Sequence, residues 1–271
     1  METRPTKCSF SLCEDAVGSE AETDMSKNMG TSPKAALRGE PSYIWRAGQQ
    51  RRFEMICSAG AEKIKGRVLE DGCGVGEYLA HLQPLANQAV GLDFEFERAL
   101  QAHKKSKEVI CSACEHLPFP GNYFDLVISH EVLEHVGNDQ QSVSEIIRVI
   151  KPGGRLILFV PNRGYPFETH GIYWKGEYKF GNKLFVNYLP RIWRDKLAPH
   201  VRAYYERDLE KLFEGQNMLI VKRTIIFGGY DNIIARLPWL GRILRGVMQF
   251  LEHTPLKIFG LSHFWVVEIN K

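Results

Sequence analysis

The stretch that most constrains the fold is RVLEDGCGVGEYL, residues 67–79. The apolar pair Val68–Leu69 predicts a short buried strand, and a glycine at every second position from Gly72 to Gly76 predicts a sharp turn into a helix that begins near Glu77. Glycine adopts positive φ readily and lets a ligand lie against the peptide backbone, where the N–H groups of the new helix face it. The stretch therefore predicts a cofactor-binding turn between a strand and a helix.

The spacing of these glycines separates two kinds of cofactor site. A dinucleotide fingerprint, G-x-G-x-x-G, requires a third glycine at position 77, where this chain has glutamate. The pattern present, E-x-G-x-G-x-G from Glu70 to Gly76, resembles the first motif of the class I S-adenosylmethionine-dependent methyltransferases. A tight strand-to-helix turn that binds nothing is the alternative, so the later motifs must decide.

A carboxylate follows the next short apolar run, residues 89–93. Asp93 stands about 20 residues beyond the glycines, where an acid in a βαβ unit accepts hydrogen bonds from the ribose hydroxyls of a nucleoside. We therefore expect Asp93 to bind the ribose. Methyltransferases and dehydrogenases both use such an acid, so it does not separate these two classes.

The third strand is expected at residues 109–111, and the segment after it resembles the part of the family that meets the adenine ring. An acidic residue commonly stands there, but the corresponding position here is Ala113. The backbone of Ala113 and Cys114, or the side chain of Glu115, is then left to contact the adenine.

The fourth strand, expected at residues 122–129, leads into HEVLEHV, which resembles the family's fourth-strand motif. Ligands of doubly wound sheets lie beyond the carboxyl ends of the strands, so Ser129, His130 and Glu131 should border the cofactor and the substrate. Glu131 and His135 are four residues apart and are expected on one face of a helical turn.

A helix at residues 143–150, the sequence KPGG and a fifth strand at residues 155–160 complete a resemblance that covers roughly residues 43–162. It implies an α/β fold: a doubly wound, Rossmann-like seven-stranded sheet whose last strand is antiparallel. The two closing strands are expected at residues 219–227 and 264–269. The cofactor implied is S-adenosyl-L-methionine, and the residues expected to bind it are Glu70, Gly72, Cys73, Gly74, Gly76, Asp93, Phe94, Ala113, Cys114, Ser129 and His130.

Residues 163–199 form a segment that is long for a connection within one domain, and such segments are usually lids or binding elements. Aromatic side chains are frequent in it, and Glu168 and His170 are its most interesting polar pair. We expect a substrate lid inserted after strand 5. A small satellite core that merely holds the insertion down is an equal alternative.

The remaining segments complete the expected organisation. Residues 1–39 are polar and are expected to form a disordered arm, and residues 40–271 to form the methyltransferase domain. Leading helices would place Tyr43, Trp45 and Arg46 either along the pocket or, as is commoner for aromatic residues, against the core.

Residues 230–260 form an amphipathic insertion before the last strand. Within it, residues 233–251 have apolar side chains at helical spacing and arginines off that stripe. Such a helix can pack on its own domain, which is the favoured expectation, or lie on an anionic membrane.

The charge, the apolar runs and the cysteines of the chain limit the kinds of partner and the cellular location that can be expected. A net charge of +3 without a long basic run gives no reason to expect nucleic acid. No apolar run reaches the roughly 18 residues of a membrane span, and the N-terminus lacks the pattern of a signal peptide, so a cytoplasmic protein is expected, with peripheral membrane contact as an alternative. The six cysteines show no disulfide framework, and Cys111-x-x-Cys114 lacks the further ligands of a zinc site.

The reaction expected is methyl transfer to an oxygen atom, less readily to carbon or nitrogen, of a small-molecule or lipid-like acceptor. A hydroxyl acceptor profits from a base, which we assign to His135 or His170 with Glu131 or Glu168 orienting it. A divalent ion on Glu131, Glu168 and His170 is conceivable, but no metal site is predicted. The alternatives are a nicotinamide-dependent oxidoreductase on the same fold and a non-catalytic S-adenosylmethionine-binding protein.

Overall fold

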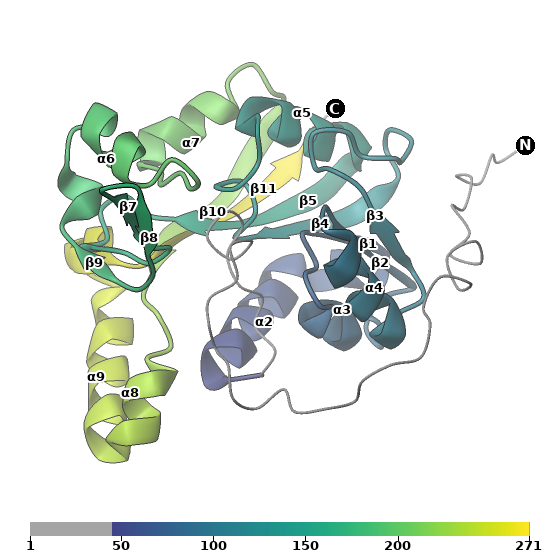
Figure 1. The fold of residues 1–271 in the computed structure, drawn as a ribbon. Coiled ribbons are helices and arrows are strands. Elements are labelled where there is room, and N and C mark those ends of the chain that lie inside the picture. The colour runs from purple at the N-terminus through teal and green to yellow at the C-terminus, as the bar shows by residue number, and fades with distance from the viewer. Residues whose placement is uncertain (1–44, 271) are drawn as a thin grey trace, which may run out of the picture.

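The computed structural model describes residues 45–270, so the expected N-terminal arm and Tyr43 lie outside the described residues. A seven-stranded sheet forms the centre, in the order β10-β11-β5-β4-β1-β2-β3 (Figure 1). Its strands are β1 (Arg67–Asp71), β2 (Gln88–Asp93), β3 (Val109–Cys111), β4 (Phe124–His130), β5 (Ile150–Pro161), β10 (Met218–Ile226) and β11 (Ser262–Ile269).

Strand direction confirms the expected topology. Strands β1 to β5 run parallel to one another, whereas β11 lies antiparallel to both β5 and β10. The chain reverses its strand order at β1, which pairs with β2 on one side and β4 on the other. Such a switch point opens a crevice beyond the carboxyl ends of the strands, and there a doubly wound sheet binds its ligands.

Helices cover both faces of the sheet, because its inner strands are apolar on both sides. On one face lie α2 (Ala47–Gly60), α3 (Glu77–Leu82) and α4 (Phe96–Lys105), whose buried residues share one core cluster. On the other lie α5 (Asp139–Val149) and α7 (Glu206–Leu212), which contribute to a second cluster. The two layers are visible above and below the sheet in Figure 1.

The expected lid consists of short elements between β5 and α7. They are β6 (Phe167–Glu168), β7 (Ile172–Trp174), β8 (Glu177–Lys179), β9 (Lys183–Leu184), the 3₁₀ helix η4 (Val186–Tyr188) and α6 (Arg191–Leu197). β6 pairs with β9, and β7 pairs with β8. The buried guanidinium of Arg163 donates to the carbonyls of Asn187 and Leu189, and so fastens the segment where it leaves β5.

Two local predictions are wrong. The expected helical turn after β4 is an irregular turn, which begins with Glu131 at a φ of 58°. The expected single helix at residues 233–251 is two helices, α8 (Asp231–Arg236) and α9 (Pro238–Leu251). Proline at the first position of α9 favours a helix start there and disfavours helical backbone at the preceding Leu237.

The helices α8 and α9 project away from the sheet as a hairpin (Figure 1). Gly241 packs against Ile234 at their crossing and is the buried residue of α9. The expected packing of the apolar stripe on the domain is only partial: Leu244 and Met248 are half-buried, whereas Val247 is exposed. Residues 45–270 contain no helix long and apolar enough to cross a membrane.

Candidate active site

The glycine turn joins β1 to α3 as the sequence predicts. Gly72, Gly74 and Gly76 have φ values of 74°, 55° and 78°, which are strained for residues with a side chain. A Cβ atom on Gly72 would lie 2.2 Å from Cγ2 of Val132, so the space beside this backbone is closed to any larger residue. The turn therefore needs glycine for both conformation and packing.

Asp93 connects the carboxyl end of β2 to this turn. Its Oδ2 accepts a hydrogen bond of 2.8 Å from the Gly74 N–H, and its Oδ1 accepts one of 2.9 Å from the Glu95 N–H. Burial raises the pKa of Asp93, although these two backbone hydrogen bonds act in the opposite direction. Each carboxylate oxygen retains a further lone pair, so the position suits the predicted contact with ribose.

Two buried acids lie at the end of β1. Glu70 has one oxygen, Oε2, without a hydrogen-bond partner among the described residues, and burial raises the pKa of its carboxyl group well above the usual value. Asp71 accepts hydrogen bonds from the Cys114 thiol and the Ser129 hydroxyl, and burial raises its pKa to about 6. Cys114 and Ser129 thus contact Asp71, a role that the sequence did not indicate.

A cavity of about 620 Å³ lies at the carboxyl ends of β1, β2 and β4. From the predicted cofactor set its wall includes Glu70, Gly72, Cys73, Gly74, Asp93, Phe94, Ala113, Cys114 and His130. Gly76 and Ser129 are not among the lining residues, although both belong to the elements that shape it. Of the predicted catalytic residues, Glu131, His135 and His170 line the cavity.

Further residues complete the wall, among them Tyr178 and Phe180, two of the aromatic residues of the 163–199 segment that were expected either to face a substrate or to form a satellite core. The lining residues that the sequence did not indicate include Gln49 of α2, Tyr78 of α3, Arg98 of α4 and Thr169. Glu115 also lines the cavity, where its Oε1 accepts a hydrogen bond of 2.7 Å from the Gly137 N–H. Trp45 does not line it but stacks on His81 at 3.9 Å between ring centroids, which matches the alternative of an aromatic residue that fixes a helix to the core.

His130 and Glu131 are held by Arg52 of α2, a residue that the sequence analysis missed. The Arg52 guanidinium contacts Nε2 of His130, and its NH1 lies 3.1 Å from Glu131 Oε1. The Ser262 hydroxyl donates to the same oxygen at 2.7 Å. Burial alone would raise the pKa of Glu131, but Arg52 lowers it to about 2. Burial and Arg52 together lower the pKa of His130 to about 3.

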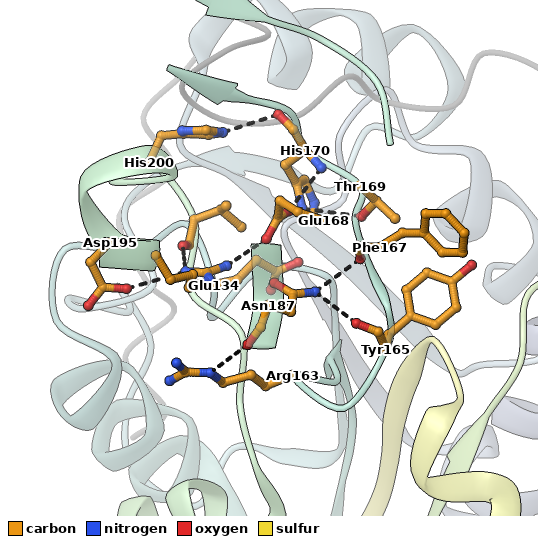
Figure 2. A network of polar contacts seen from close by, with 12 residues as sticks. Glu134, Arg163, Tyr165, Phe167, Glu168, Thr169, His170, Asn187, Asp195 and His200 are labelled. Atoms are coloured by element: carbon orange, nitrogen blue, oxygen red, sulfur yellow. Dashed lines mark hydrogen bonds and ion pairs between the residues drawn. The ribbon is translucent and has the colours of Figure 1, made fainter. Parts of the chain in front are cut away.

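Glu168 and His170 form the polar pair expected in the lid, and both are drawn in Figure 2. His170 Nδ1 lies 3.2 Å from Glu168 Oε1, which also accepts the His170 backbone N–H. The other oxygen of Glu168 accepts a hydrogen bond of 2.7 Å from the buried Arg194. Burial opposes the charge on Glu168, but His170 and Arg194 together lower its pKa to about 2.

His135 comes from the turn after β4 and meets His170 edge to face, with 5.1 Å between ring centroids. Its Nδ1 lies 3.4 Å from the carbonyl oxygen of His200, and its Nε2 lies 4.0 Å from Oε1 of Glu134. Burial lowers the pKa of His135 to about 3. The structure thus brings together His135, His170 and Glu168, and adds Glu134, whereas Glu131 pairs with Arg52 instead.

The fold and the cavity together define a class of protein: a Rossmann-like α/β domain that binds a nucleoside-containing cofactor beyond the carboxyl ends of its strands. Residues 69–158 match the sequence model of the family described as "Methyltransferase domain". Over this part of its length the chain is similar to the class I S-adenosylmethionine-dependent methyltransferases.

Individual relatives match over part of their length. A probable S-adenosylmethionine-dependent methyltransferase of Mycolicibacterium smegmatis is 34% identical over 118 residues, which cover 42% of this chain and 45% of that protein. Malonyl-(acyl-carrier protein) O-methyltransferase of Buchnera aphidicola is 30% identical over 108 residues, which cover 39% of this chain and 44% of that protein. The chain thus spans less than half the length of these two relatives.

Solved structures support the fold. The S-adenosylmethionine-dependent methyltransferase from Mesorhizobium loti superimposes with a TM-score of 0.57 at 16% identity, covering 82% of this chain and 98% of the other. The cofactor of the family is S-adenosyl-L-methionine. The residues present fit it: Asp93 suits the ribose, and the unpaired oxygen of Glu70 suits a hydrogen-bond donor such as the amino group of the cofactor.

Proposed function

We propose that this protein transfers the methyl group of S-adenosylmethionine to an oxygen atom of a small-molecule or lipid-like acceptor. The single observation that carries the proposal is that one cavity connects the glycine turn and Asp93 with the polar side chains of the lid. A cofactor held at the first end would direct its methyl group toward an acceptor at the second. Residues 163–199 would then act as the substrate lid.

The sulfonium methyl group is activated by its own positive charge, so the main work of the protein is to align an acceptor with it and to exclude water. The oxygen of the acceptor attacks the methyl carbon, and the electrons of the carbon–sulfur bond pass to sulfur. A hydroxyl group must also lose its proton. Its nearest titratable neighbours in this cavity would be His135 and His170.

Of these two histidines, His170 has the geometry of a base. Its Nδ1–H donates to Glu168, which leaves Nε2 able to accept a proton, and Arg194 fixes Glu168 in turn. Burial lowers the pKa of His135 to about 3, so the neutral ring of His135 is a weak base at neutral pH. We therefore assign the proton transfer to His170, with Glu168 orienting it, and a packing role to His135.

Oxygen is favoured as the acceptor atom because carbon, nitrogen and thiolate acceptors need little more than alignment, whereas this cavity provides an oriented histidine. The O-methyltransferase from Buchnera aphidicola also gives a precedent for oxygen among the relatives.

A lipid-like acceptor is supported by the hairpin of α8 and α9, whose large apolar side chains include Trp239 and Phe250, both 67% exposed. Arg236 and Arg242 are exposed on the same hairpin and would suit an anionic membrane surface.

The test is incubation of the protein with methyl-labelled S-adenosylmethionine and fractionated cell extract, followed by identification of the labelled product by mass. We expect a methyl ether or methyl ester. Calorimetry with S-adenosylmethionine and with NAD runs in parallel. Cofactor binding without a labelled product in any fraction would favour the non-catalytic alternative, and saturable NAD binding without S-adenosylmethionine binding would favour the oxidoreductase.

A further inference from the structure

We propose that Glu134, His135 and His170 bind a divalent transition-metal cation, of which Zn²⁺ is the best match, at the acceptor end of the cavity. One ligand atom from each of the three residues lies within 4.8 Å of the other two. Ligands about 2.0–2.2 Å from zinc stand roughly 3–4 Å apart, so small side-chain rotations close this set around an ion. The inference rests on the proposed methyl transfer only for the role of the cation.

Glu134 is the first reason for the proposal. The residue is 1% exposed, and neither carboxylate oxygen has a hydrogen-bond partner within the geometric limits among residues 45–270. Buried carboxyl groups are otherwise paired, hydrogen-bonded or bound to metal ions. The Glu131 carboxylate is close enough to accept a hydrogen bond from Glu134 only while Glu134 is protonated; when both groups are charged, they repel each other. A cation beside His135 and His170 supplies the missing partner.

The outer contacts of the two histidines are the second reason. Histidines that bind metals almost always donate their other ring N–H to a carboxylate or a backbone carbonyl, which fixes the orientation of the ring. His170 has a carboxylate partner, Glu168 (Figure 2), and the other oxygen of Glu168 accepts a hydrogen bond from Arg194. His135 has a carbonyl partner, that of His200. Both rings use Nδ1 for these contacts, so Nε2 is the nitrogen that remains to bind the cation.

The chemistry of the donor set indicates the kind of cation. Two imidazoles and one carboxylate are the ligands of catalytic zinc and of non-haem iron, whereas magnesium and calcium prefer sets made of oxygen atoms. Three protein ligands also leave a coordination position open. His135 and His170 line the cavity, so that position would face the acceptor.

A cation there would change how the acceptor is activated. It would bind the acceptor hydroxyl and lower the pKa of that group, as bound metal ions do for water. The oxygen then attacks the methyl carbon, the electrons of the carbon–sulfur bond pass to sulfur, and the hydroxyl proton passes to water. His170 serves as a ligand in this arrangement and as the base only in the metal-free protein.

The test begins with the full chain stripped by a chelator and titrated calorimetrically with Zn²⁺ alone and with Mg²⁺ alone. We expect one Zn²⁺ site with at least tenfold weaker binding in Glu134→Gln and in His170→Gln, and much weaker binding of Mg²⁺. The matched control is His116→Gln, because His116 is an exposed histidine outside the cavity wall, and it should bind Zn²⁺ like the unaltered protein. Equal Zn²⁺ affinity in all four proteins, or none in the unaltered protein, overturns the site.

A second measurement covers the case in which a variant does not fold. X-ray absorption of the zinc-loaded unaltered protein should show nitrogen and oxygen ligands at about 2.0–2.2 Å. A sulfur shell near 2.3 Å would place the ion on cysteines and overturn the assignment.

Binding of S-adenosylmethionine, measured on the same stripped protein, separates this inference from the proposed function. If the protein has no Zn²⁺ site but still binds S-adenosylmethionine and transfers its methyl group, the proposed function stands and the proposed cation site is overturned. A Zn²⁺ site that requires Glu134 and His170, in a protein that does not bind S-adenosylmethionine, supports the cation site and overturns the methyl transfer.

Discussion

Removal of Arg194 tests how the proposed lid, residues 163–199, is held together. The side chain of Arg194 is 2% exposed; it donates to Glu168 Oε2 at 2.7 Å and to the Val201 carbonyl at 2.6 Å. Arg194→Met keeps most of the apolar volume but leaves the charge of Glu168 buried without its cation. Breaking a buried ion pair from one side costs about 3–5 kcal/mol, so the free energy of unfolding should fall by about that amount.

The assay is urea unfolding at pH 7, followed by circular dichroism, with a thermal melt as a check. For a domain of this size, about 3–5 kcal/mol corresponds to a fall in melting temperature of roughly 6–20 °C. The double variant Glu168→Gln with Arg194→Met carries no unpaired charge and should be more stable than Arg194→Met alone. The control is Arg191→Met on the same helix, because Arg191 is 61% exposed in its pair with Asp208, and such surface pairs contribute about 0–1 kcal/mol.

Two results would refute this reasoning. The first is a loss below about 1 kcal/mol for Arg194→Met, no larger than that of the control. The second is a double variant less stable than Arg194→Met, which would show that the arginine stabilises the lid by packing and not by neutralising Glu168.

Three further predictions concern the cofactor, pH and the hairpin. Asp93→Ala should weaken S-adenosylmethionine binding by about 1–3 kcal/mol in calorimetry, and unchanged affinity would remove Asp93 from its role. Burial lowers the pKa of His263, so as the pH falls the unfolded chain binds a proton at this residue before the folded protein does. The free energy of unfolding should therefore decrease as the pH drops below about 6.5. Urea titrations at pH 5 to 8 should show a smaller decrease for His263→Gln. Alanine at both Trp239 and Phe250 should weaken sedimentation with anionic vesicles by about 2 kcal/mol or more, whereas Leu219→Ala, an exposed apolar change on β10, should not.

The sheet could be predicted from the sequence because its signals are local. Each of these signals, the glycine turn, the apolar runs of residues 68–69 and 89–92 and the acid that ends β2, is formed by residues that are neighbours in the sequence. Their order along the chain resembles that of a known family, and this resemblance implied the seven-stranded sheet with its antiparallel last strand. The break at Leu237 was missed although Pro238 signals it, because the apolar periodicity runs straight through the proline.

Much of the candidate site depends on contacts between residues far apart in sequence. Arg52 of α2 contacts His130 and Glu131 at the carboxyl end of β4, and nothing near Arg52 in the sequence indicates that partnership. The burial of Glu134 could not be predicted, because a glutamate is ordinarily exposed, whereas here the turn after β4 directs it inward. A helical turn was expected at that place, so the positive φ of Glu131, which changes the direction of the following residues, could not be foreseen.

The chain of contacts from Arg194 through Glu168 to His170 links the stability of the lid to the chemistry proposed for it. A catalytic or metal-binding histidine must be held within a fraction of an ångström of its working position, and a second layer of hydrogen bonds is the usual means. Here that layer is a buried ion pair, which costs desolvation and gives little net stability by itself. The main effect of the Arg194–Glu168 ion pair is then to orient the ring of His170. Arg194→Met should therefore weaken Zn²⁺ binding as well as folding, while Arg191→Met, with the same change on the exposed side of α6, should alter neither by more than a small amount.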